Sequence, residues 1–200
     1  MTTAVRPRGE YAKSAGRREA IVAAAIEVFG ESGYWNGSLR EVAERAGLSQ
    51  TGLLHHFATK TDLLLAVLTR RDELASALVG DVPTSGLERL RHFLAIVEQN
   101  TRTPGLVALF TVLSAEASSP EHPAHDYFIR RSATVDREFE RAFELAAAEG
   151  ALRPHVVPSH AARGIGALMD GLQVQWLYRR DLDMVGEVRA YLDALLVAPL

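Results

Sequence analysis

The chain has 200 residues, 48% of them hydrophobic, with a formal net charge of -3 and no cysteine. This length and apolar content suffice for one large or two small globular domains, and the lack of cysteine excludes disulfides and thiolate metal sites. The sequence shows neither the apolar run of about 18 residues that a membrane span needs nor the pattern of a signal peptide, so we expect a cytoplasmic protein with no membrane partner.

The first 16 residues lack helical periodicity and contain a proline and two glycines, which predicts a disordered arm. Residues 1–18 hold five basic side chains against one acidic side chain, although the whole chain is acidic. A basic end on an acidic body is typical of a protein that turns one face toward phosphates. The arm is either a solvated tail or a contact to the phosphates or the minor groove of DNA.

A first helix is predicted over residues 17–32, because apolar residues recur there at helical spacing and Gly33 follows them. Tyr34 and Trp35 come next. We expect these two aromatic side chains to cover the bottom of a three-helix core rather than to stack on a nucleotide base.

Residues 38–47 have the pattern of a second helix that ends in a sharp turn. Ser38 is followed three residues later by Glu41, which predicts a reciprocal capping box at the start of the helix. Gly47 can take the left-handed conformation that ends a helix and turns the chain. Leu48 would then fill the corner of a helix-turn-helix.

A third helix is predicted over residues 49–57, with Ser49 as its cap. Leu53 and Phe57 lie four residues apart and can pack on the preceding helix. The other side has no acidic residue, and its Gln and Thr side chains both donate and accept hydrogen bonds, as reading base edges in a major groove requires. We therefore assign base contacts to Gln50, Thr51 and His55.

Thr59 and Asp62 form a further cap pattern, which opens a long helix at Lys60. The ammonium of Lys60 would stand near a helix N-terminus, where backbone N–H groups also favour a phosphate. The side chains expected to contact DNA phosphates are Ser49, His56, Thr59 and Lys60.

Residues from about 17 to 70 resemble the DNA-binding domain of the TetR (tetracycline-repressor-like) family of bacterial regulators. The resemblance rests on the order of Phe29, Gly33 and Tyr34, the two helices of the helix-turn-helix, and Lys60. It implies a helix-turn-helix domain over residues 17–62 and a helical effector-binding and dimerisation domain over residues 63–200. The family usually has a tyrosine, commonly a phosphate contact, where this chain has Leu54. Here that contact is either missing or has passed to His55.

Helical periodicity continues to the end of the chain without any strand pattern, so we predict an all-α fold of nine helices. The helix that begins at Lys60 should run to about Val79, stop at Gly80, and link the DNA-binding domain to the body. Ser85 and Glu88 predict another capping box. The later helices are expected to begin near Ser85, Thr103, Ala124, Ser159 and Asp183.

The last two predicted helices are apolar and contain small residues that permit close approach. They could simply complete the monomer core. A single recognition helix, however, buries too little surface to hold an operator tightly, and helix-turn-helix proteins usually place two of them one DNA turn, or a multiple of it, apart. We therefore expect a homodimer in which these two helices of each chain form a four-helix bundle, as the TetR resemblance also implies.

Seven histidines raise the possibility of a metal or catalytic site. His122 and His125 lie near two acidic residues, but a solvated pair is commoner in such a loop than a zinc site. His92 is expected at the edge of the core, bonded to a backbone carbonyl, rather than facing a ligand. Neither a phosphate-binding loop nor a nucleophile elbow occurs, so we predict no catalytic residue, metal or cofactor.

A helical body attached to a DNA-reading domain suggests a small-molecule effector site. Such sites are mostly apolar with few polar groups, so we expect a hydrophobic or aromatic ligand. The same residues could equally be ordinary core. The candidate lining residues are Phe93, Val97, Leu109, Phe110, Phe139, Phe143, Met169, Gln173 and Trp176.

The main hypothesis is a ligand-responsive transcriptional regulator, a repressor, that binds a palindromic operator in double-stranded DNA as a homodimer. Two others stay open. One is an all-α enzyme or small-molecule carrier in which the helix-turn-helix is only structural. The other is a constitutive DNA-binding protein without an effector. The basic arm and the acid-free face around Gln50 speak against the enzyme or carrier.

Overall fold

The computed structural model describes residues 8–79 and 84–200. Within these ranges it contains nine helices and, apart from one isolated bridge, no strand, which confirms the predicted all-α class. No helix in the same ranges is both long and apolar enough to cross a membrane. The helices are α1 (Arg8–Asn36), α2 (Leu39–Arg45), α3 (Gln50–Leu54), α4 (Lys60–Val79), α5 (Gly86–Arg102), α6 (Pro104–Glu116), α7 (His125–Ala148), α8 (Pro158–Tyr178) and α9 (Met184–Leu195).

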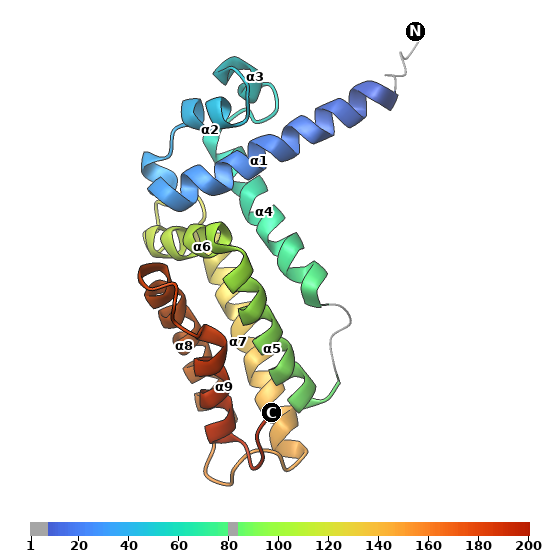
Figure 1. Ribbon diagram of the computed structural model, residues 1–200, viewed down its shortest axis with the longest axis vertical. Helices are drawn as coiled ribbons and strands as arrows, with labels where there is room; N and C mark the ends of the chain where they lie inside the picture. Colours follow the sequence, from blue (N-terminus) through green and yellow to red (C-terminus); the bar gives the residue numbers. More distant parts are fainter. Residues whose placement is uncertain (1–7, 80–83) are drawn as a thin grey trace.

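The helices pack into two groups, which we call the head and the body (Figure 1). The head consists of α1, α2, α3 and the first half of α4, and the body is a bundle of α5, α7, α8 and α9. Between them lies α6, directly beneath α1 in Figure 1. It contributes Leu109 and Leu113 to the apolar core of the head and Val107 to that of the body. Besides α4, α6 is therefore the main physical connection between the two groups.

The first helix begins earlier than the sequence pattern indicated. The predicted disordered arm is wrong for residues 8–16, which form the start of α1, whereas residues 1–7 lie outside the described residues. Its alanine, lysine, arginine and glutamate residues are good helix formers and offset Gly9 and Gly16, which cost about 1 kcal/mol each. Gly33 ends the regular helix as predicted, because its φ of 73° lies in the left-handed region.

The start of α5 is capped by a distant residue rather than by its own sequence. The predicted capping box of Ser85 and Glu88 is wrong, since the Ser85 side chain makes no cap bond. Instead Glu149, just after α7, accepts hydrogen bonds from the Gly86 N–H at 2.8 Å and the Ser85 hydroxyl at 3.3 Å. A Cβ on Gly86 would collide with the backbone of Ala146, so α5 and α7 meet backbone to backbone.

Candidate DNA-binding surface and effector cavity

Local hydrogen bonds build the helix-turn-helix. The Ser38 hydroxyl accepts from the backbone N–H groups of Arg40 at 3.2 Å and Glu41 at 3.5 Å, and Ser49 accepts from Gly52 at 3.1 Å. Gly47, with φ of 68°, makes the turn between the two helices. Both helix starts and the turn are therefore where the sequence predicted them, although α3 ends at Leu54 rather than Phe57.

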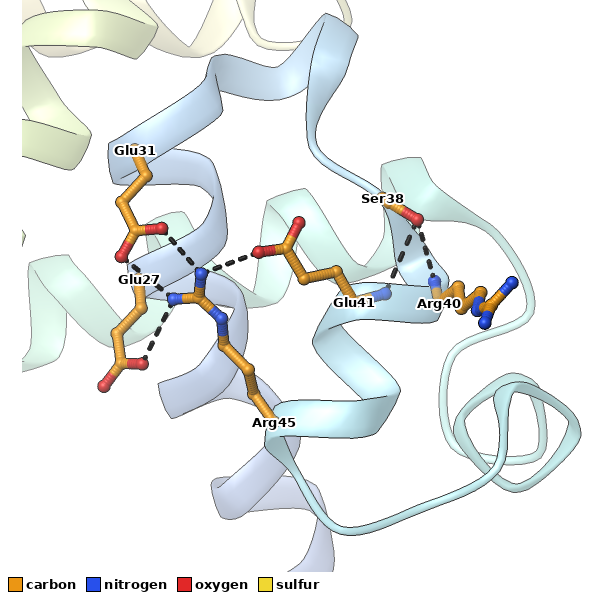
Figure 2. Close-up of polar contacts among 6 residues, drawn as sticks. All are labelled: Glu27, Glu31, Ser38, Arg40, Glu41 and Arg45. Atoms are coloured by element: carbon orange, nitrogen blue, oxygen red, sulfur yellow. Dashed lines mark hydrogen bonds and ion pairs between the residues drawn. The ribbon is translucent and has the colours of Figure 1, made fainter.

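Arg45 ties α2 to α1 (Figure 2). Its guanidinium donates to both carboxylate oxygens of Glu31 at 2.9 and 2.6 Å, binds Glu41 at 2.6 Å, and lies 3.5 Å from Glu27. The hydrogen bonds that Arg45 donates to Glu31, and then the one to Glu41, raise the pKa of Arg45, and Arg45 in turn lowers the pKa of Glu31. Glu41 is thus used to position Arg45 instead of completing a capping box with Ser38. The cluster orients the helix-turn-helix on α1.

Of the three predicted base-reading residues, two lie on the exposed side of α3 and the third, His55, lies directly after its last residue. Gln50, Thr51 and His55 are all exposed, while Leu53 and Phe57 are buried beneath them at 0% and 2% exposure. Residues 49–58 contain no acidic side chain. This surface can therefore approach a polyanion without electrostatic repulsion from within the segment.

The predicted phosphate contacts are less uniform. Ser49 is exposed, whereas His56 is half-buried and its carbonyl accepts a hydrogen bond from Arg18 at 3.3 Å. Both the N–H and the hydroxyl of Thr59 donate to Asp62, at 3.0 and 2.8 Å, so a phosphate would have to displace that carboxylate. Leu54, in place of the expected tyrosine, is 40% exposed.

The ammonium of Lys60 already makes contacts within the protein. Its ammonium donates to the Trp35 carbonyl at 3.2 Å and lies 4.8 Å from the centre of the Tyr34 ring. Burial lowers the pKa of Lys60, and the charge of Glu116 opposes this shift. Because an ammonium has three N–H donors, the bond to Trp35 leaves others available for a phosphate.

The head and the body meet at a polar joint that the sequence did not predict. Glu116, the last residue of α6, accepts a hydrogen bond from the Tyr34 N–H at 2.6 Å, and its carboxylate lies 3.6 Å from the Nε2 atom of His122. His122 is only 2% exposed and packs edge-on against both Tyr34 and Trp35. The expectation of a solvated histidine is therefore wrong for His122.

The aromatic residues at this joint differ in their burial. Tyr34 is buried at 7% exposure, as expected, but Trp35 is 54% exposed and does not cover the core. No group of three or more metal-ligating side chains occurs in the part of the chain that the structure describes.

A cavity of about 670 Å³ lies within the body, with walls from α4, α5, α6, α7 and α8. Five of the nine predicted lining residues face it, namely Phe93, Phe110, Phe139, Met169 and Gln173. The other four belong to cores: Leu109 to that of the head, and Val97, Phe143 and Trp176 to that of the body. Apolar residue type alone did not distinguish a cavity wall from a packed interior.

The cavity also carries charges that the sequence did not predict. His92 lines it as well, and its buried Nε2 atom has no hydrogen-bond partner, so the expected bond to a backbone carbonyl is absent there. The charged lining residues are Arg71, Arg89, Arg131, Asp136, Glu138, Arg163 and Asp170. The cavity can therefore bind polar groups as well as apolar ones.

Comparisons with known proteins agree with this arrangement. Residues 21–67 match the family model described as "Bacterial regulatory proteins, tetR family". The chain is 28% identical over 165 residues to the HTH-type transcriptional regulator BetI of Agrobacterium fabrum, covering 80% of this chain and 76% of that protein. It is 42% identical over 90 residues to the HTH-type transcriptional activator FasR of Mycolicibacterium smegmatis, covering 44% of this chain and 41% of FasR.

A solved structure shares the fold over nearly the whole chain. The TetR-family transcriptional regulator from Agrobacterium tumefaciens superposes with a TM-score of 0.79 at 17% identity, covering 92% of this chain and 100% of that one. The similarity therefore includes the body as well as the helix-turn-helix.

Proposed function

Because this chain belongs to the TetR family of bacterial regulatory proteins, we propose that it is a ligand-responsive repressor that binds a palindromic operator as a homodimer. It is a transcriptional regulator with a helix-turn-helix DNA-binding domain and not an enzyme. One observation carries the more specific proposal. Gln50 and Thr51 on α3 and His55 at its end are all exposed, Ser49 caps α3, and Arg45 holds the preceding helix α2 to α1.

In this proposal, residues 17–62 form the DNA-binding domain and residues 63–200 bind the effector and dimerise. Gln50, Thr51 and His55 read base edges in the major groove, while the neighbouring polar side chains hold the DNA backbone. The proposed phosphate contacts are Ser49, His56, Thr59 and Lys60.

The proposed dimer pairs α8 and α9 of the two chains. Much of the apolar surface of these helices, including Ile165, Leu172 and Leu192, is used in the monomer core. Other residues on α8 remain outside it, since Val174 is 37% exposed and Tyr178 is 82% exposed. A two-fold bundle through this surface would place two α3 helices on one duplex, as a palindromic operator requires.

The position of α4 supports release by an effector, because α4 begins in the head at Lys60 and lines the body cavity through Arg71. A ligand that fits the cavity better in one orientation of α4 shifts the dimer toward that orientation. The shift can be no larger than the ligand's difference in affinity for the two states. Release then requires that the favoured state no longer fits the spacing of the operator half-sites.

Two substitutions separate base reading from phosphate binding. Gln50→Ala should weaken binding to the operator by about 1–3 kcal/mol per base contact and barely affect random DNA. Lys60→Ala should weaken binding to both and reduce the slope of log affinity against log salt by about one per lost contact. Fluorescence anisotropy with duplexes from upstream of the protein's own gene, at several salt concentrations, measures both effects.

The matched control for Lys60→Ala is Arg153→Ala, which removes an exposed positive charge from the body. It should leave the affinity and the salt slope unchanged. If Gln50→Ala weakens operator and random DNA equally, the proposed base-reading role is wrong. A constitutive DNA-binding protein without an effector would instead show no thermal shift with any compound in a ligand screen.

A further inference from the structure

Two arginines from different helices line the cavity beside one aromatic ring. The guanidinium carbons of Arg71 on α4 and Arg131 on α7 lie 4.3 and 5.5 Å from the centre of the Phe110 ring. Both pair with one oxygen of Asp72, at 3.3 and 2.8 Å, and Tyr127 donates to the other oxygen at 2.9 Å. Two positive charges therefore share a single carboxylate.

Several buried nitrogen atoms on the cavity wall lack a hydrogen-bond partner. The Nε atom of Arg131 is buried and has no partner, and the same is true of Arg89 Nε and His92 Nε2 on the cavity wall. All the unpartnered buried side-chain atoms found in the described residues are nitrogens. An unsatisfied buried donor is costly, so a ligand that supplies acceptor oxygens would gain from meeting it. A carboxylate suits guanidinium groups because its two oxygens match their parallel N–H donors.

The other lining residues restrict the remainder of a ligand whose carboxylate binds the two arginines. Phe93, Phe139 and Met169 offer an apolar surface. Asp136 and Asp170 also line the cavity, and no ion pair within 4.0 Å joins either of them to an arginine among the described residues. Burial, and then the charge of Asp136, raises the pKa of Asp170, while the charges of Arg131 and Arg71 oppose this shift. A second anionic group on the ligand would be repelled by the charge of Asp136.

We propose that the effector is an amphiphile with a single carboxylate, which binds Arg71 and Arg131 while its apolar part lies against Phe93, Phe139 and Met169. This inference rests on the proposed function, because it names the chemical class of the effector, and it adds a carboxylate to the hydrophobic or aromatic ligand expected from the sequence. Arg71 belongs to α4, so the carboxylate contacts the helix that leads to the head. Binding and the position of the head are thereby connected through one side chain.

The test compares three ligands that differ only in the charged group: octanoate, 1-octanol and octylammonium. Each is titrated calorimetrically into the full-length protein at pH 7. Octanoate should bind at least about tenfold more tightly than the other two, as expected for charge-assisted hydrogen bonds. Arg71→Gln and Arg131→Gln should each remove most of this preference. Arg130→Gln, which removes an exposed arginine of α7 that does not line the cavity, should leave it unchanged.

Equal or tighter binding of octanol or octylammonium to the unsubstituted protein overturns the inference, as does the absence of binding by all three. Because this comparison uses the unsubstituted chain, it does not depend on whether the variants fold. Operator affinity, measured separately with saturating octanoate, tests the proposed function. Octanoate that binds without weakening the DNA complex would contradict effector release but leave the carboxylate site standing.

Discussion

Thr51→Glu should lower operator affinity by at least about 100-fold while leaving the protein folded. Thr51 is exposed on α3, so a glutamate there would face the phosphates at close range and remove a hydrogen bond to a base, at about 1–3 kcal/mol for each half-site. The same substitution is favourable for the helix, because Thr51 is the second residue of α3 and a negative charge near a helix N-terminus is stabilising. Anisotropy titration measures the loss of operator affinity, and thermal unfolding shows whether the protein stays folded.

Ser159→Glu provides the matched control. Ser159 is likewise exposed and is the second residue of α8, in the body. It should change neither operator affinity nor the oligomeric state measured by light scattering. Operator binding that survives Thr51→Glu would mean that α3 does not face the DNA.

Glu116→Ala should destabilise the head more than any other single substitution at the joint. It leaves the Tyr34 N–H without its 2.6 Å acceptor and removes the carboxylate beside the buried His122. Hydrogen bonds to charged groups are worth about 1.5–3 kcal/mol, and the free energy of unfolding of the head should fall by about that amount. Glu116→Gln, which keeps an acceptor oxygen, should cost less.

The two tryptophans allow the head and the body to be observed separately. Trp35 lies in the head beside His122, and Trp176 lies in the core of the body. Urea unfolding followed by fluorescence in a Trp176→Phe background reports the head, and in a Trp35→Phe background it reports the body. Glu116→Ala should shift the head transition to lower urea more than the body transition. An equal shift of both, or of the body alone, would show that Glu116 does not hold the joint.

Local features of this chain were predictable because their causes are local. Ser38, Gly47 and Ser49 mark helix starts and a turn through bonds to residues close in sequence, and all three were placed correctly. The all-α class followed in the same way from helical periodicity. The surface of α3 was predictable because Leu53 and Phe57 fix which side is buried.

Features that depend on distant residues were missed. Glu149 caps α5 from over 60 residues away, and Glu116 reaches Tyr34 across 82 positions. Nothing in the local sequence distinguishes such a glutamate from a solvated one. The cavity was recognised only by its apolar residues, because the convergence of Arg71 and Arg131 on one aromatic ring depends on how α4, α6 and α7 pack.

The position of α3 in the DNA complex can be measured directly, because the chain has no cysteine and a single one can be introduced. His55→Cys, labelled with an iron chelate that cleaves nearby DNA, should cut the operator at two symmetric positions, one DNA turn or a multiple of it apart. The same label on Ser159→Cys should not cut. Cleavage by the label at position 159 with none at position 55, or cuts at a single position, would contradict a dimer that reads its operator through α3.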